Sequence, residues 1–205
     1  KQGSTTNELG IRMEISAANK FVFSLIKQNV GTSDVTSLTT AQTNTWYHVV
    51  GVSNGTTQYL YVNGNLEGSG TIAISSATQS VSNLFIGQLY NNTLRFNGQI
   101  DEFKVYNSAL AAADIKIDYN RNSSQVLGAT GDNTNFQVQA QGQEYCVPGS
   151  TDTCTAPGGR WDFEEKTGTA AYDTSTNGNT GTLTNSPAWT NGKVGTGLEF
   201  SQANS

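Results

Sequence analysis

The sequence predicts an all-β fold: an antiparallel β-sandwich with one short helix and a long polar linker. Three observations support this prediction. The 205-residue chain contains 22 glycines and is also rich in Thr, Ser and Asn, which favour turns and strands over helices. Segments that alternate apolar and polar residues fill the first hundred positions. One stretch, residues 108–119, has the pattern of a helix.

Six segments have the alternation and the β-branched or aromatic residues expected of strands. In chain order they are "GIRMEI", "KFVFSLI", "WYHVVGVS", "TQYLYVNG", "NLFIGQL" and "GQIDEFKVY". Asn63-Gly64 is a strong turn signal after "LYV". Six strands are enough for a pair of sheets.

The helix is predicted in "SALAAADIKIDY", residues 108–119, with Ser108 as its N-cap. Leu110, Ile115 and Ile117 are its expected buried residues. We expect a short helix that packs on the edge of the sandwich.

The chain divides into residues 1–120, a polar linker over 121–160, and residues 161–205. Within the linker, "NFQVQAQ" alternates Phe136, Val138 and Ala140 with polar residues, which is typical of an edge strand. Apolar patterning resumes at Trp161. The C-terminal piece is too short to bury a core of its own, so its strands must pair with something else.

The charge balance excludes some partners. Eleven basic and sixteen acidic residues give no positive surface for nucleic acid or anionic lipid. No run of 18 apolar residues exists, so membrane insertion is not expected. Because the sequence begins "KQGS" without Met or a signal peptide, we expect a processed or excised piece of a longer protein.

The two cysteines, Cys146 and Cys154 in "YCVPGSTDTC", flank a Pro-Gly turn. They form either a structural disulfide or two free thiols, and the disulfide interpretation predicts an extracellular or cell-surface protein. Two thiols and the single histidine, His48, are too few ligands for zinc. Asn54, Asn91 and Asn122 begin N-x-S/T sequons and are candidate glycosylation sites.

An ordered series of motifs runs through "TWYHVVGVSNGTTQYLYVNGNLEG" and "LFIGQLYNNTLRFNGQIDEFKVYNSALAAADI". With these motifs residues 1–120 resemble the second half of a laminin G-like module of the concanavalin A-like jelly-roll superfamily. "RWDFEEKTGTAAYDTSTNGNTGTL" and "AWTNGKVGTGLEF" resemble the first half of the same module. The resemblance implies a jelly-roll sandwich whose halves occur in reversed order, as in a piece of a tandem bacterial surface protein.

The reversed order leaves two alternatives. Residues 161–205 either fold back onto the sandwich of their own chain or add strands to a neighbouring copy or an adjacent tandem module. The family's middle stretch, between "GLEF" and "KQGS", is missing from the sequence. The apolar residues expected to enter the completed core are Trp161, Phe163, Leu183, Leu198 and Phe200.

A calcium ion is a candidate cofactor. "DTSTNGN" places oxygen-bearing side chains at Asp173, Ser175, Asn177 and Asn179, a spacing similar to that of a calcium loop, although a solvated Asx/Ser turn explains it equally well. The superfamily resemblance also implies structural calcium at Asp101, for which a hydrogen-bonded core-edge Asp is the alternative. If Asp101 and Asp173 converge, the ion would tie the C-terminal strands to the sandwich.

The sequence favours a non-catalytic protein. Asp101 and Glu102 are adjacent on a predicted strand and point to opposite faces. Asp162 and Glu164 share a face at the spacing of glycoside hydrolase carboxylates, but no aromatic platform accompanies them, so this function is the least favoured. His48 is interpreted as a core histidine.

Glycan binding is the alternative that the jelly-roll resemblance implies. Its candidate residues are Tyr90, Asn91, Asn92 and Trp189, which also have structural explanations as turn residues or, for Trp189, as a core anchor. The sequence therefore predicts an extracellular surface or structural module, a filament or array subunit assembled by β-strand complementation between copies, with a glycan-binding adhesion module as the alternative.

Overall fold

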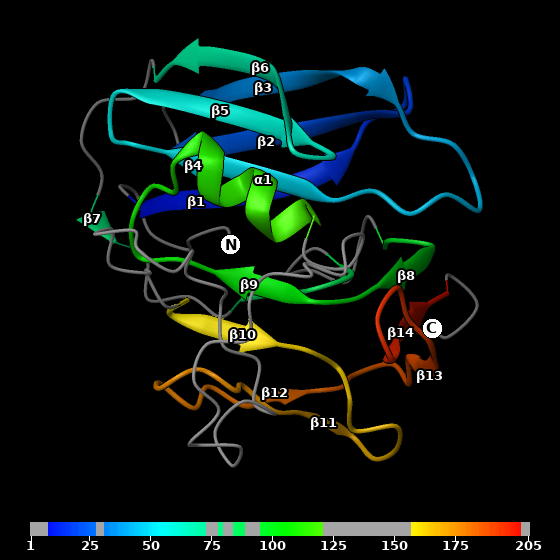
Figure 1. Ribbon diagram of the computed structural model, residues 1–205. Coiled ribbons are helices and arrows are strands. Elements are labelled where there is room, and N and C mark those ends of the chain that lie inside the picture. The colour runs from blue at the N-terminus through cyan, green and yellow to red at the C-terminus, as the bar shows by residue number, and fades with distance from the viewer. Residues whose placement is uncertain are drawn as a thin grey trace, which may run out of the picture.

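The computed structural model describes residues 8–27, 31–72, 78–79, 84–88, 95–120 and 157–201. The predictions for Tyr90, Asn91, Asn92, Asn122, Cys146, Cys154 and "NFQVQAQ" lie outside these residues. Within them the chain forms antiparallel sheets and one short helix, which confirms the predicted β-sandwich of jelly-roll type (Figure 1). None of the described segments is a helix long and apolar enough to cross a bilayer.

Two sheets from the N-terminal part of the chain face each other. The first has the strand order β3-β2-β1-β7 and the second the order β4-β5-β6. Residues on the facing sides form one core: Phe21, Phe23, Leu25, Val35, Leu60 and Val62. The strands are β1 (Glu8–Ile15), β2 (Lys20–Lys27), β3 (Gly31–Thr40), β4 (Val49–Ser53), β5 (Thr57–Val62), β6 (Asn65–Thr71) and β7 (Thr78–Gln79).

Strands β3 and β6 are polar segments that the sequence pattern did not predict. On β3 every second residue from Ser33 to Ser37 is buried, and two of these three residues are serines. Their hydroxyls are hydrogen-bonded: Ser37 Oγ accepts from the Phe21 amide at 3.0 Å, and Ser33 Oγ accepts from Gln58 Nε2 at 3.1 Å. A search for alternating apolar residues misses strands that bury hydroxyls in this way.

Three of the predicted strands differ in the structure. "WYHVVGVS" becomes a strand only from Val49, and residues 84–88 of "NLFIGQL" lie outside strands. "GQIDEFKVY" divides into β8 (Gly98–Ile100) and β9 (Phe103–Val105), separated by Asp101 and Glu102. Glu102 has a φ of +49°, in the left-handed region that breaks a strand. Asp101 and Glu102 therefore do not point to opposite faces of one strand as predicted, because neither residue is on a strand.

The helix α1 (Ala112–Asn120) lies on a sheet face, not on the sandwich edge as predicted. Ile115 is fully buried against Val52 of β4 and Tyr61 of β5, on the side of that sheet away from the main core. The prediction that Ile117 is buried is wrong, since its side chain is 37% exposed. The helix starts after Ala111, whose amide donates to Asp114 Oδ2 at 3.2 Å, so Ser108 is too far upstream to cap it.

The C-terminal segment pairs with residues 98–105 of its own chain (Figure 1). Strand β10 (Gly159–Trp161) is antiparallel to β9, and β14 (Thr196–Phe200) lies between β8 and β13 (Ala188–Asn191). Strands β11 (Ala170–Ala171) and β12 (Gly181–Thr182) form a small hairpin. A second core joins the two segments: Trp161, Phe163, Ala171 and Leu198 are buried, and Ile100, Phe103, Leu183, Trp189 and Phe200 pack against them.

Candidate functional site

The candidate site is the seam where the C-terminal segment meets residues 98–105. A chain of ion pairs crosses it. Lys104 Nζ of β9 lies 2.7 Å from Asp118 Oδ1 of α1 and 3.8 Å from Glu102 Oε2. Arg160 of β10 lies 3.8 Å from the same Glu102 oxygen and donates from Nε to Asp162 Oδ1 at 2.5 Å. The ion pairs thus connect the helix, β9 and β10.

His48 extends this series of ion pairs at helix α1. Its Nε2 lies 3.2 Å from Asp118 Oδ2, so the prediction of a core histidine gives way to a half-buried histidine in an ion-pair network. Burial alone would raise the pKa of Asp118, but the hydrogen bond to His48 and the charge of Lys104 outweigh it and hold that pKa well below its usual range. Burial and the nearby Asp162 carboxylate raise the pKa of Glu102.

Asp173 organises the loop after β11. Its Oδ1 accepts from the amides of Arg160 and Ser175, each at 2.9 Å, and its Oδ2 accepts from the amide of Asn179 at 2.8 Å. Burial would raise the pKa of Asp173, but these hydrogen bonds lower it to about 2. The carboxylate therefore fixes the loop onto the end of β10.

Asp101 fastens the other side of the C-terminal segment in the same way, by accepting hydrogen bonds from main-chain amides. Its Oδ1 accepts from the amide of Glu102 and its Oδ2 from the amide of Val194, both at 2.8 Å. Burial nevertheless raises the pKa of Asp101 above its ordinary value. The contact with Val194 holds the turn between β13 and β14 against the break between β8 and β9.

Four of the five predicted calcium ligands, Asp101, Asp173, Ser175 and Asn177, use their side chains in hydrogen bonds within the protein. Both oxygens of Asp173 already accept main-chain hydrogen bonds, and Asn177 Nδ2 donates to the Gly158 carbonyl at 2.8 Å. Ser175 Oγ accepts from the Asn177 amide at 3.3 Å. Among the described residues no cluster of three or more His, Cys, Asp or Glu side chains could hold a metal. Calcium binding by Asp101, Asp173, Ser175, Asn177 and Asn179 stays a prediction.

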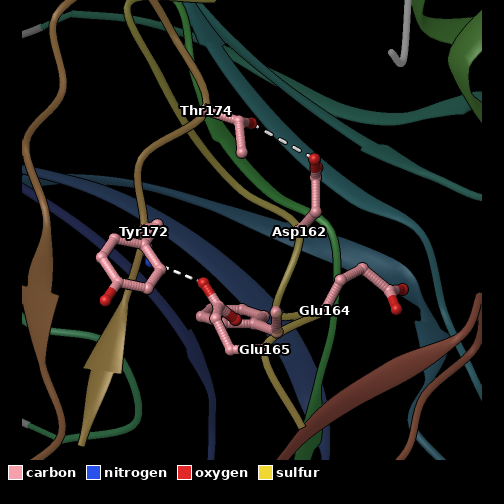
Figure 2. Close-up of a pocket in the computed structure, with 6 residues that line it drawn as sticks. Asp162, Glu164, Glu165, Tyr172 and Thr174 are labelled. Carbon is pink, nitrogen blue, oxygen red and sulfur yellow. Dashed lines mark hydrogen bonds between the residues drawn. The ribbon is translucent and has the colours of Figure 1, made fainter. Parts of the chain in front are cut away.

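An open pocket of about 280 Å³ lies beside the seam and is lined by Asp162, Phe163, Glu164, Glu165, Tyr172 and Thr174. Figure 2 shows its three carboxylates pointing in different directions. Asp162 accepts from Thr174 Oγ1 at 3.2 Å, and Glu165 accepts from the Tyr172 amide at 2.6 Å. Glu164 points away from both and accepts from the Thr196 amide at 3.2 Å.

The pocket differs from the predicted pair of carboxylates on one strand face. Strand β10 ends at Trp161, and Phe163 has a φ of +59°, so Asp162 and Glu164 lie on an irregular turn. The burial predicted for Trp161 and Phe163 is found. Glu165, Tyr172 and Thr174 were missed, because only the folded loop brings residues 162–165 and 172–174 together.

A second hollow, of about 410 Å³, surrounds Trp189, the one predicted glycan-binding residue within the described part of the chain. Its other lining residues are Lys166, Thr190, Asn191 and Thr196. Trp189 Nε1 donates to the Gly168 carbonyl at 3.0 Å, and part of its ring packs against the second core. The sequence did not indicate Lys166 and Thr196, because only the folded chain brings them beside residues 189–191.

A family model described as the concanavalin A-like lectin/glucanases superfamily matches residues 2–116, more than half of the chain. The chain belongs to this superfamily, within its laminin G-like branch. A search of curated proteins finds no match. One similar solved structure is an S-layer domain-containing protein (residues 221–444) from Clostridium thermocellum ATCC 27405, with 23% identity and a TM-score of 0.35. The similarity covers 56% of this chain and 58% of that one.

Proposed function

We propose that this laminin G-like chain is a non-catalytic extracellular structural module that assembles with further copies by β-strand complementation. The observation that carries the proposal is the closure of its fold by a distant segment. Strands β8 and β9 obtain their partners β14 and β10 from residues 159–200, which follow α1 only after residues 121–156. The same ladder and core can form when the C-terminal segment comes from a neighbouring copy.

The chemistry of the seam supports exchange between copies. Its contacts are a main-chain ladder, an apolar core around Trp161 and Leu198, and an ion pair between Arg160 and Glu102. The ladder and the ion pair join residues 98–105 to residues 159–200, and the core packs Ile100 and Phe103 against side chains of the later segment. None of them depends on which copy supplies the second segment.

The non-catalytic part of the proposal rests on the pocket carboxylates. A glycoside hydrolase needs two carboxyl groups facing one bond, one of them to donate a proton and the other to act as base or nucleophile. Asp162, Glu164 and Glu165 diverge, and each is hydrogen-bonded to this chain's own groups. Their arrangement serves to hold the turn.

The assembly is tested by the native mass in solution, measured by light scattering over a range of concentrations. We expect particles many times the 21.8 kDa of one chain, which fall to that mass only in denaturant. Leu198→Asp, which places a charge in the second core, should reduce the particles to smaller species. The matched control is Leu66→Asp, since Leu66 is exposed on β6. A monomer at every concentration would contradict the proposal.

Glycan binding is the second candidate, favoured by the hollow at Trp189. An aromatic ring beside amide, hydroxyl and ammonium groups offers stacking and hydrogen bonds to a sugar. We expect binding on a glycan array that Asn191→Ala weakens without changing the melting temperature, because Asn191 is exposed. Binding that survives both Asn191→Ala and Lys166→Ala would place the sugar elsewhere.

A further inference from the structure

The core-facing side of β1 carries an apolar stripe that is exposed. Met13 and Ile15 lie directly opposite Phe23 and Phe21 of β2, and directly paired residues share a face of the sheet. Phe23 is 3% exposed, whereas Met13 and Ile15 are each 41% exposed. These two residues, with the neighbouring Ile11, face the same side as the core and yet lie outside it.

The stripe is exposed because the covering sheet is one strand too narrow. Gly68 of β6 lies against Val35 of β3, and Gly51 of β4 lies against the ring of Phe23 of β2. The covering sheet ends at β4, for which β5 is the only partner strand in the described part of the chain. Since neighbouring strands are about 4.8 Å apart, one more strand on the open edge of β4 would lie above β1.

We propose that the open edge of β4 and the stripe of Met13 and Ile15 form an acceptor site for one extended strand, occupied by residues 135–141 of the same chain. The acceptor requires main-chain groups for the edge of β4 and apolar side chains at alternate positions. The sequence 135–141, "NFQVQAQ", supplies Phe136, Val138 and Ala140 in alternation and carries no charge. Its intervening Gln side chains suit the solvent-facing side of the added strand.

The course of the chain favours an occupant from the same molecule. Helix α1 ends at Asn120, and the ring of Tyr119 lies 5.8 Å from the ring of His48, the residue before β4. Residues 121–134, 14 in number, connect this point to residue 135. Fourteen residues can reach at most about 48 Å, so residues 135–141 can lie along the edge of β4 in the same molecule. The site does not depend on the proposed assembly of copies.

Met13 is the single methionine of the chain, so its oxidation by peroxide reports directly on the cover of the stripe. We expect Val138→Lys to speed the oxidation of Met13 several-fold in the full-length protein, because Lys cannot enter the apolar site. Gln139→Lys, one position away on the opposite face of the added strand, is the matched control and should leave the rate unchanged. Equal rates in both variants, or Met13 oxidising as fast as in urea without any substitution, would overturn the proposal.

The source of the strand is identified by replacing Met13 with the photoreactive residue p-benzoylphenylalanine. Equal amounts of nitrogen-15-labelled and unlabelled chains are refolded together, irradiated and mapped by mass spectrometry. We expect cross-links from position 13 to residues 135–141 that join peptides of the same isotope. The same photoreactive residue at Glu14, on the other face of β1, should not reach 135–141. Cross-links that join labelled to unlabelled peptides would assign the strand to a second copy. The absence of any cross-link from position 13 to residues 135–141 would overturn the proposal.

Discussion

Asp173 and Asp101 use their carboxylates in the same way at the two sides of the C-terminal segment. Each carboxylate accepts hydrogen bonds from main-chain amides of residues that the sequence separates widely, Arg160 for Asp173 and Val194 for Asp101. Hydrogen bonds from amides to a charged carboxylate are stronger than those between neutral groups. At the residue scale, these two aspartates fasten the C-terminal segment through direct hydrogen bonds to the main chain.

Asp173→Ala should lower the free energy of unfolding by about 2 kcal/mol, since three amides lose a charged acceptor. The pKa of Asp173 is about 2 in the folded protein, below the ordinary 3.8, so its contribution is complete above about pH 4. It is lost as the pH falls toward 2. Urea unfolding at pH 7 and pH 2 should therefore show a difference between wild type and variant that shrinks at the lower pH.

The control for this change is Glu199→Ala, which removes the same charge from an exposed position on β14. It should change the free energy of unfolding by less than about 0.5 kcal/mol. An equal loss in both variants would mean that net charge, and not the hydrogen bonds of Asp173, is responsible.

Calcium should not stabilise the protein through the 173–179 loop in its present conformation, because both carboxylate oxygens of Asp173 already accept main-chain hydrogen bonds. A site present at 100 times its dissociation constant would add about 2.7 kcal/mol. We expect thermal unfolding curves in millimolar calcium and in EDTA to coincide. A melting temperature that rises with calcium in the wild type but not in Asp173→Asn would show that the loop rearranges around the ion, as the sequence spacing suggests.

At the scale of elements, the break between β8 and β9 decides how the C-terminal segment attaches. A continuous strand over 98–106 would offer its edges to one pair of neighbours. The turn at Asp101 and Glu102 instead gives two short strands, one paired with β14 and the other with β10. The segment is therefore held at two places, with the ion pairs of Lys104 and Arg160 beside the second.

The helix α1 offers a matched test of how one element is anchored. Ile115→Ala should lower the free energy of unfolding by about 2 to 5 kcal/mol, the usual effect of truncating a large buried aliphatic side chain, because Ile115 is fully buried. Ile117→Ala, two residues along the same helix, should cost less than about 1 kcal/mol, because its side chain is 37% exposed. Chemical denaturation measures both, and equal effects would mean that α1 packs differently.

At the scale of the whole molecule, the protein has two apolar cores with different origins. The core around Phe23 and Leu60 comes entirely from residues before α1, whereas the core around Trp161 and Leu198 needs both segments. Deleting residues 157–205 therefore leaves Ile100 and Phe103 without their cover and β8 and β9 without partners. The molecule's stability depends on its last quarter.

We expect this truncated chain to remain rich in β-structure by circular dichroism but to aggregate and bind a hydrophobic dye. The physical reason is the exposure of unpaired strand edges together with apolar side chains. The full-length chain, prepared in parallel, is the control. A truncated chain that is soluble and melts cooperatively would show that the second core is dispensable.

Much of the fold was determined by the sequence alone. Periodicity located β1, β2, β5 and α1. In β2 and β5 the apolar side chains at alternate positions are buried in the main core, which is the spacing that the pattern predicts. Periodicity also picked Trp161, Phe163 and Leu198 as core residues of the C-terminal strands. The laminin G-like motifs gave the sandwich type, because a long ordered series of turns and core positions specifies one topology.

Tertiary structure alone decided which residues meet. Strand β3 was missed because its buried serines depend on hydrogen bonds from other strands, from Phe21 of β2 and Gln58 of β5. Asp101 accepts from the amide of Val194, 93 residues later in the chain, and His48 lies beside Asp118 of the helix. Periodicity records which face a residue occupies, but hydrogen bonds and ion pairs depend on the distance between segments, which only the folded chain sets.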